Sequence, residues 1–152
     1  MPLLEFRVYG VPAPQGSKRY VGRGIMVESS KKVRPWRADV LAASMIAVDK
    51  NQWSKPITDP VEIQVEFYFP RPKNHYGTGK NAQKLKPSAP TFVTSSTSGD
   101  LDKLCRSTLD ALAQKSGGLV LSDDSIVVSL YAIKRYVDTE PPGALISVLQ
   151  TG

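Results

Sequence analysis

The most restrictive feature of the sequence is a strict alternation of apolar and polar side chains over residues 61–69. The odd positions are valine, isoleucine or phenylalanine, whereas the even positions include Glu62, Gln64 and Glu66. Successive side chains of a strand point to opposite faces of a sheet. The alternation therefore predicts a β-strand that buries one face and exposes the other.

Other parts of the chain also have the composition of strands. Residues 3–11 predict a first strand, and residues 20–27 predict a short hairpin around two glycines. Residues 126–137 predict a longer strand with a polar end. Residues 144–149 predict the last strand, which we expect at an edge of the sheet.

Two segments have the periodicity of helices. The first runs from Trp36 to about Lys50, and Pro35 is a candidate first helical residue because proline is favoured at that position. In the second, residues 101–112, apolar side chains recur at intervals of three and four. We expect the glycine pair at 117–118 to end this helix, because glycine is common just after the last helical turn.

The length and composition predict one ordinary globular domain. A chain of 152 residues suits a single hydrophobic core, and 41% hydrophobic with 22% charged residues excludes an intrinsically disordered chain. We therefore expect a single domain over residues 1–152. Its class is α/β (α+β), with two main helices packed on a mixed β-sheet and a long basic loop at residues 70–98.

The cysteine and histidine content limits the metals that the chain can bind. Cys105 and His75 are each the only residue of their type, which excludes an internal disulfide and any multi-cysteine or multi-histidine site. Oxygen ligands instead select magnesium, manganese or calcium. Cys105 is expected in the core, and a cytoplasmic location fits a single cysteine. We expect no signal peptide and no membrane span, because long apolar runs are absent from the sequence.

Positive charge points toward nucleic acid. The formal net charge is +6, which attracts polyanions, although a charge of this size can also serve only solubility. The basic clusters could be solvated charges, and the 70–98 loop could be a flexible insertion. The candidates for DNA contacts are Lys18, Arg19, Lys31, Lys32, Arg34, Arg37, Arg71, Lys73 and Lys103.

Acidic residues flank the second helix. Asp100 and Asp102 are two apart in an expected extended approach, so both carboxylates can point the same way. Asp123 and Asp124 follow the helix at a turn. If the helix folds back, these carboxylates converge and require a divalent cation between them. Taken singly, the first pair could be helix caps and the second pair only a turn.

The order of these residues resembles the RusA family of Holliday-junction resolvases, endodeoxyribonucleases common in phages and prophages. The family motif is roughly D-L-D-N-x-x-K-x-x-x-D-A-L, followed after an interval by a D-D pair. Here residues 100–112 are DLDKLCRSTLDAL, and the pair is Asp123-Asp124. The order of the predicted elements is similar too, apart from the 70–98 loop.

The resemblance implies a mixed α/β fold, a homodimer, and cutting of four-way junction DNA with Mg²⁺, for which Mn²⁺ can substitute. By position, it implies that Asp100, Asp102 and Asp124 bind the metal and that Asp123 is an outer-shell residue. The family's helix lysine falls on Arg106, so the resemblance implies a catalytic cation with the planar fork of arginine.

Two departures from the family motif keep other hypotheses open. Lys103 stands in place of asparagine and Arg106 in place of lysine. A catalytically inactive protein that binds junction or duplex DNA is therefore the second hypothesis. A third is a small-molecule phosphohydrolase that uses the same metal, although the net charge and the basic loop count against it.

Overall fold

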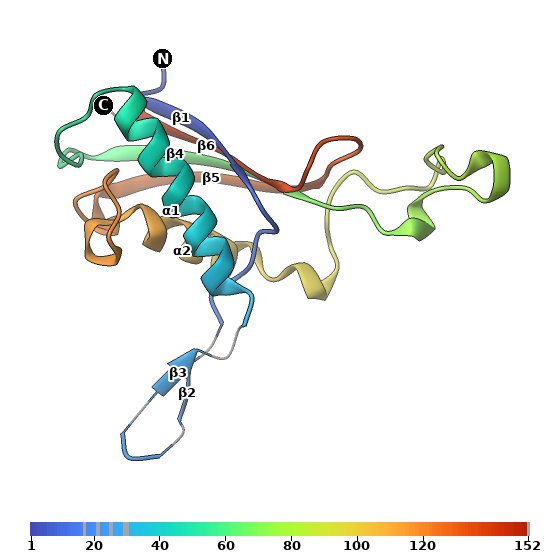
Figure 1. The fold of residues 1–152 in the computed structure, drawn as a ribbon, viewed down its shortest axis with the longest axis horizontal. Helices are drawn as coiled ribbons and strands as arrows, with labels where there is room; N and C mark the ends of the chain where they lie inside the picture. Colours follow the sequence, from blue (N-terminus) through green and yellow to red (C-terminus); the bar gives the residue numbers. More distant parts are fainter. Residues whose placement is uncertain (17, 21, 25, 29–30, 152) are drawn as a thin grey trace.

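The computed structural model of the protein describes residues 1–16, 18–20, 22–24, 26–28 and 31–151. Its main sheet has four strands in the order β1-β6-β4-β5, and helices α1 and α2 pack against this sheet and against each other (Figure 1). The expected class, a mixed α/β fold with two main helices on a mixed sheet, is confirmed. The elements are β1 (Leu4–Tyr9), β2 (Lys18–Tyr20), β3 (Met26–Glu28), α1 (Val33–Lys50), β4 (Val61–Phe69), α2 (Leu101–Leu112), β5 (Val127–Tyr136) and β6 (Gly143–Gln150).

Strand β4 forms the centre of the core, as its alternation predicted. The odd-numbered side chains from Val61 to Phe67 are at most 1% exposed, and they face the helices. The polar side chains of Glu62, Gln64 and Glu66 lie on the opposite, more accessible face. The strand is parallel to β5 and antiparallel to β6, which makes the sheet mixed.

Strand β6 lies inside the sheet, so the expectation of an edge position was wrong. It pairs antiparallel with β1 on one side and with β4 on the other. Ala144, Ile146 and Val148 are fully buried. A short apolar run predicts a strand, but it contains no information about which strands will pair with it. In this sheet the outer strands are β1 and β5.

Helix α1 begins before the predicted start. Its first residue is Val33, so Pro35 is the third helical residue and not the first. Proline is tolerated there because amides of the first turn have no partner inside the helix. Trp36 is fully buried, and its Nε1 donates a hydrogen bond to Thr108 Oγ1 at 3.1 Å. This bond joins α1 to α2.

Helix α2 ends at Leu112 and not at the glycine pair 117–118. Ala113 is already extended, and it forms a bridge with Leu121. The Leu121 N–H donates to the Leu112 carbonyl at 3.0 Å, so the returning chain satisfies the end of the helix. The glycines belong to the following turn, in which Gly117 has a φ of 89°.

Strands β2 and β3 form the expected short hairpin, which projects from the domain (Figure 1). Val21 and Ile25, which were also expected in its arms, lie outside the described residues. Within the described ranges, none of the helices combines the length and the apolar character needed to cross a membrane.

Candidate active site

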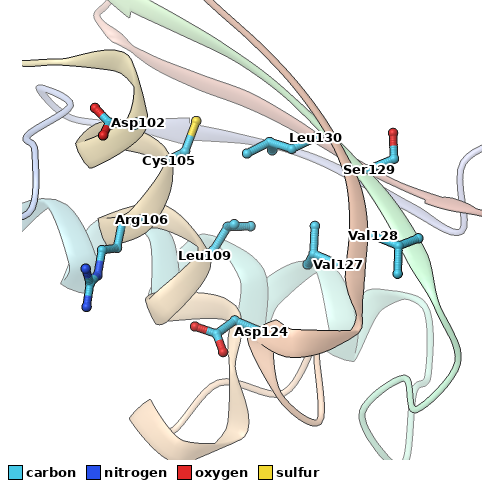
Figure 2. A pocket seen from close by; sticks show the side chains of 9 residues that line it. All are labelled: Asp102, Cys105, Arg106, Leu109, Asp124, Val127, Val128, Ser129 and Leu130. Atoms are coloured by element: carbon cyan, nitrogen blue, oxygen red, sulfur yellow. The ribbon is translucent and has the colours of Figure 1, made fainter.

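A cleft of about 400 Å³ opens between helix α2 and strand β5 (Figure 2). Apolar side chains from both elements form its floor, and charged side chains stand at its rim. It is lined by Asp102, Cys105, Arg106, Leu109, Asp124, Val127, Val128, Ser129 and Leu130. The cleft therefore contains Asp102, Arg106 and Asp124, three of the four residues expected to be catalytic.

The start of α2 is held by the loop that follows β1. Ser107 Oγ donates a hydrogen bond to the Ala13 carbonyl at 2.7 Å. Gly99 has a φ of 91°, and a Cβ atom there would lie 2.5 Å from Pro14 Cγ, so only glycine fits. Lys134 of β5 donates to the Gly99 carbonyl at 2.9 Å. These contacts fix the position of the first carboxylates relative to the sheet.

Asp100 and Asp102 lie at the N-terminal end of α2. Asp100 is the extended N-cap residue, but its side chain accepts no capping hydrogen bond. Asp102 belongs to the first turn of the helix and not to the extended approach that we expected. Both residues are exposed, and among the described residues neither carboxylate forms an ion pair. The two carboxylates are therefore accessible to an external cation.

Asp124 lies at the opposite end of the cleft from Asp102 (Figure 2). Its carboxylate is close enough to Asp110 to affect the pKa of that residue. Lys115 Nζ donates a hydrogen bond to Asp124 Oδ1 at 3.2 Å. Asp110 Oδ2 is 4.0 Å from Arg37 Nη2. Burial raises the pKa of Asp110, Arg37 lowers it, and the neighbouring Asp124 raises it again. Each carboxylate at this end therefore has a cation of the protein beside it.

Asp123 has a structural contact at the turn before β5. Its Oδ2 accepts a hydrogen bond from the Ser125 N–H at 3.0 Å, which caps the short 3-10 turn Asp124–Ile126. Hydrogen bonding from the Ser125 side chain, together with this backbone hydrogen bond, lowers the pKa of Asp123. The turn role considered from the sequence is thus present, and the outer-shell role stays a prediction.

The three carboxylates expected to share a metal do not form one cluster. In the part of the chain that the structure describes, no three histidine, cysteine, aspartate or glutamate side chains are grouped closely enough to hold an ion. Asp124 returns to the level of Asp110 because α2 ends at Leu112 and the chain turns back there. The proximity of Asp110 and Asp124 could not be predicted from the sequence, because it depends on the end of the helix at Leu112.

Arg106 and Cys105 lie side by side in the helix but differ in environment. Arg106 is exposed at the rim of the cleft and has no ion-pair partner among the described residues. Asp110, four residues after Arg106 in the same helix, is next to Arg37 instead. Cys105 is 4% exposed, and burial together with Asp102 raises its pKa to about 11. The thiol is therefore a core group, as expected.

The candidates for DNA contacts fall into three groups. Arg37 and Arg71 have carboxylate partners within the protein. The backbone of Lys18 and Arg19 lies in β2. The exposed candidates are Lys31, Lys32, Arg34, Lys73 and Lys103. Their contacts with DNA stay predictions, and those of the two paired arginines require them to exchange partners.

Comparison with known proteins gives consistent results. The sequence profile of the family described as endodeoxyribonuclease RusA matches residues 10–148. The chain is also 28% identical over 136 residues to the uncharacterized protein YqaN of Bacillus subtilis (strain 168). The aligned region covers 90% of this chain and 89% of YqaN. The profile match includes α2, β5 and the cleft between them. This chain therefore belongs to the RusA family of endodeoxyribonucleases, and the family implies an endonuclease that resolves Holliday junctions.

Proposed function

We propose that the protein is a Mg²⁺-dependent, structure-selective endonuclease that resolves four-way junctions by phosphodiester hydrolysis. Its setting would be DNA recombination and repair in the cytoplasm of a bacterial or phage-infected cell. The observation that carries the proposal is the cleft between α2 and β5, where Asp102, Arg106 and Asp124 stand at motif positions of the family.

The donor atoms of the cleft fit magnesium in kind. Mg²⁺ commonly uses one or two carboxylates together with substrate phosphates and water, and does not require a closed protein cage. Asp100 and Asp102 are exposed and lack ion-pair partners among the described residues. Asp124 can contribute if it releases its hydrogen bond from Lys115. Bound magnesium, or manganese in its place, supplies charge stabilisation at the phosphoryl oxygens and an activated water.

The other residues of the cleft bind and orient the substrate in this proposal. The exposed Arg106 guanidinium can donate two parallel hydrogen bonds to a phosphate, because its planar fork matches the oxygens. Lys103 adds a second exposed cation on the same helix. Lys31, Lys32 and Arg34 at the start of α1 would bind the DNA backbone without reading its sequence.

We also propose that the protein acts as a homodimer through strand β5. Its inner edge pairs with β4, and residues 91–93 pair with the outer edge of its second half, as in the bridge between Phe92 and Arg135. The outer edge of its first half has no strand beside it in the described chain. There Val128, Leu130 and Tyr131 are 59%, 45% and 61% exposed. Two copies related by a two-fold axis would offer two active sites to a two-fold junction.

A catalytically inactive DNA-binding protein is the second candidate. The observation that favours it is the pairing of Asp124 with Lys115, together with the lack of a three-carboxylate cluster among the described residues. Such a protein would bind junctions without cutting them at any concentration of Mg²⁺ or Mn²⁺.

Purified protein incubated with a synthetic four-way junction tests the proposal. We expect paired cuts near the crossover with Mg²⁺ or Mn²⁺ and none with EDTA, and little cutting of linear duplex. Sizing of the free protein should give twice the monomer mass, and Tyr131→Lys should reduce it to the monomer. Binding without cutting would support the inactive alternative, and cutting of all DNA alike would remove the proposed selectivity.

A further inference from the structure

Residues 70–98 leave the end of β4, project from the domain and return to the start of α2 (Figure 1). We call residues 71–92 the basic arm. The arm contains no acidic residue, and its exposed lysines are Lys73, Lys80, Lys84 and Lys86. None of these lysines forms an ion pair with a described residue. The arm therefore presents unbalanced positive charge away from the cleft.

The two legs of the arm pair with each other. Tyr76 and Leu85 form an antiparallel bridge. The Gly77 N–H donates to the Lys84 carbonyl at 3.0 Å, and the Lys86 N–H donates to the His75 carbonyl at 2.9 Å. Because these backbone hydrogen bonds connect both legs, the lysines near the tip are held on a frame before any ligand arrives.

The base of the arm is attached to the end of β5 through Arg71. The Arg71 side chain is only 7% exposed, and its Nε lies 2.8 Å from Asp138 Oδ1. Its Nη1 donates to the Pro90 carbonyl at 2.6 Å, which links the outgoing leg to the returning one. The guanidinium also lies over the Tyr136 ring, 5.2 Å from the centroid, and His75 packs edge-on against the same ring at 4.8 Å.

The returning leg connects the arm with the candidate active site. The Tyr136 N–H donates to the Thr91 carbonyl at 3.0 Å, so this leg adds a short pairing at the edge of β5. The chain then passes through the 3-10 turn Ser96–Ser98 directly into Asp100 and α2. The arm is therefore hydrogen-bonded to β5, the strand that forms one wall of the cleft.

We propose that the basic arm binds the phosphate backbone of a duplex limb of the DNA junction, at a distance from the point of cleavage. Lysines are compact cations that attract phosphates of any sequence. Arg71, whose charge is matched by Asp138, acts as a positioning residue for the arm and does not contact the DNA. This inference rests on the proposed function, because it takes the junction as the substrate.

Limb length provides the test. Binding is measured in EDTA with two junctions whose limbs span about one and about three helical turns. For Lys80→Ala/Lys84→Ala we expect binding of the long junction to fall about three- to tenfold near physiological salt, with a slope of log K against log[salt] smaller by about one to two. Binding of the short junction should be unchanged. The matched control is Lys50→Ala/Lys55→Ala, which removes the same charge from exposed sites at the C-terminal end of α1 and in the segment that follows it.

A second variant tests the positioning role. Asp138→Asn leaves every lysine in place but removes the partner of Arg71. We expect it to lose part of the preference for the long junction while short-junction binding remains that of the wild type. If the arm variant keeps the long-junction preference of its control, the arm proposal is overturned and the proposed function stands. If the wild-type protein binds no junction at all, both proposals fall.

Discussion

Helix α2 has aspartates near both ends, and the protein surrounds the two groups in different ways. Asp100 and Asp102 at the N-terminal end are exposed and form no ion pair in the described chain. At the C-terminal end, Asp110 lies by Arg37, and Asp124 accepts a hydrogen bond from Lys115. The first group is therefore accessible to a cation from outside, whereas Asp110 and Asp124 of the second group each have a cation of the protein beside them.

The difference separates the two roles that a carboxylate can have near an active site. An unpaired carboxylate in the first helical turn is only weakly stabilised by the helix dipole and is available to a metal ion or to a water bound to it. A paired and partly buried carboxylate is a structural group whose loss disturbs its neighbours. We therefore expect cleavage to depend most strongly on the N-terminal group.

The largest expected effect is that of Asp102→Asn. Because carboxylate-held metal stabilises the transition state by several kcal/mol, junction cleavage should fall by about a hundredfold or more. Asp59→Asn, at an exposed position outside the cleft, is the matched charge control and should cleave like the wild type. Single-turnover cleavage with a labelled junction measures both. Asp102→Asn activity within threefold of the control would contradict the proposed role.

The local parts of this comparison could be predicted from the sequence. The stripe of apolar residues in 101–112 predicted which face of α2 is buried. The alternation in 61–69 predicted which face of β4 is buried. Both patterns arise within one element, so they do not depend on the rest of the fold. Asp102, Arg106 and Asp124, which were selected from the motif, also line the same cleft.

The parts that depend on tertiary contacts could not be predicted. The bridge between Ala113 and Leu121 ends α2 early and brings Asp124 beside Asp110. The pair between Arg37 and Asp110 joins two helices far apart in the sequence. The interior position of β6 likewise follows from its partners β1 and β4. The periodicity of a single segment cannot predict contacts between segments that are far apart in the sequence.

Arg106 is expected to have the second-largest effect. Arg106→Gln removes an exposed cation at the rim of the cleft, and we expect cleavage to fall about tenfold, as for the loss of one charged contact of about 1.5–3 kcal/mol. Arg106→Lys restores the charge and the residue type of the family motif, and it should recover most of the activity. Single-turnover rates at saturating protein distinguish this from weaker binding. Equal loss in both variants would show that the guanidinium shape, and not its charge, is required.

A substitution of Lys115 would leave Asp124 without its cation, so that it resembles the unpaired carboxylates at the N-terminal end of α2. Lys115→Met removes the hydrogen bond to Asp124 and leaves this carboxylate available to an external cation. Exposed ion pairs are weak because water and salt screen them, so the Mg²⁺ concentration for half-maximal cleavage should fall by about fivefold at most. Titration of cleavage against Mg²⁺ measures the shift, with Lys50→Met as the control. An unchanged or higher requirement would mean that Asp124 does not take part in metal binding.

The smallest expected effect is a pH dependence of stability that comes from Asp110. In the unfolded chain this residue titrates near its ordinary pKa of 3.8, and in the folded protein burial raises that pKa. Between the two values the folded protein holds a proton that the unfolded chain has released. Raising the pH through this window therefore lowers the free energy of unfolding, and the loss is complete above the folded pKa.

Asp110→Asn cannot ionise, so it lacks this loss. Its free energy of unfolding should rise relative to that of the wild type as the pH is raised above the ordinary pKa of 3.8, as measured by urea unfolding. Parallel pH profiles for wild type and Asp110→Asn would mean that Arg37 fully offsets the burial of the carboxylate. The two ends of α2 would then differ in exposure alone.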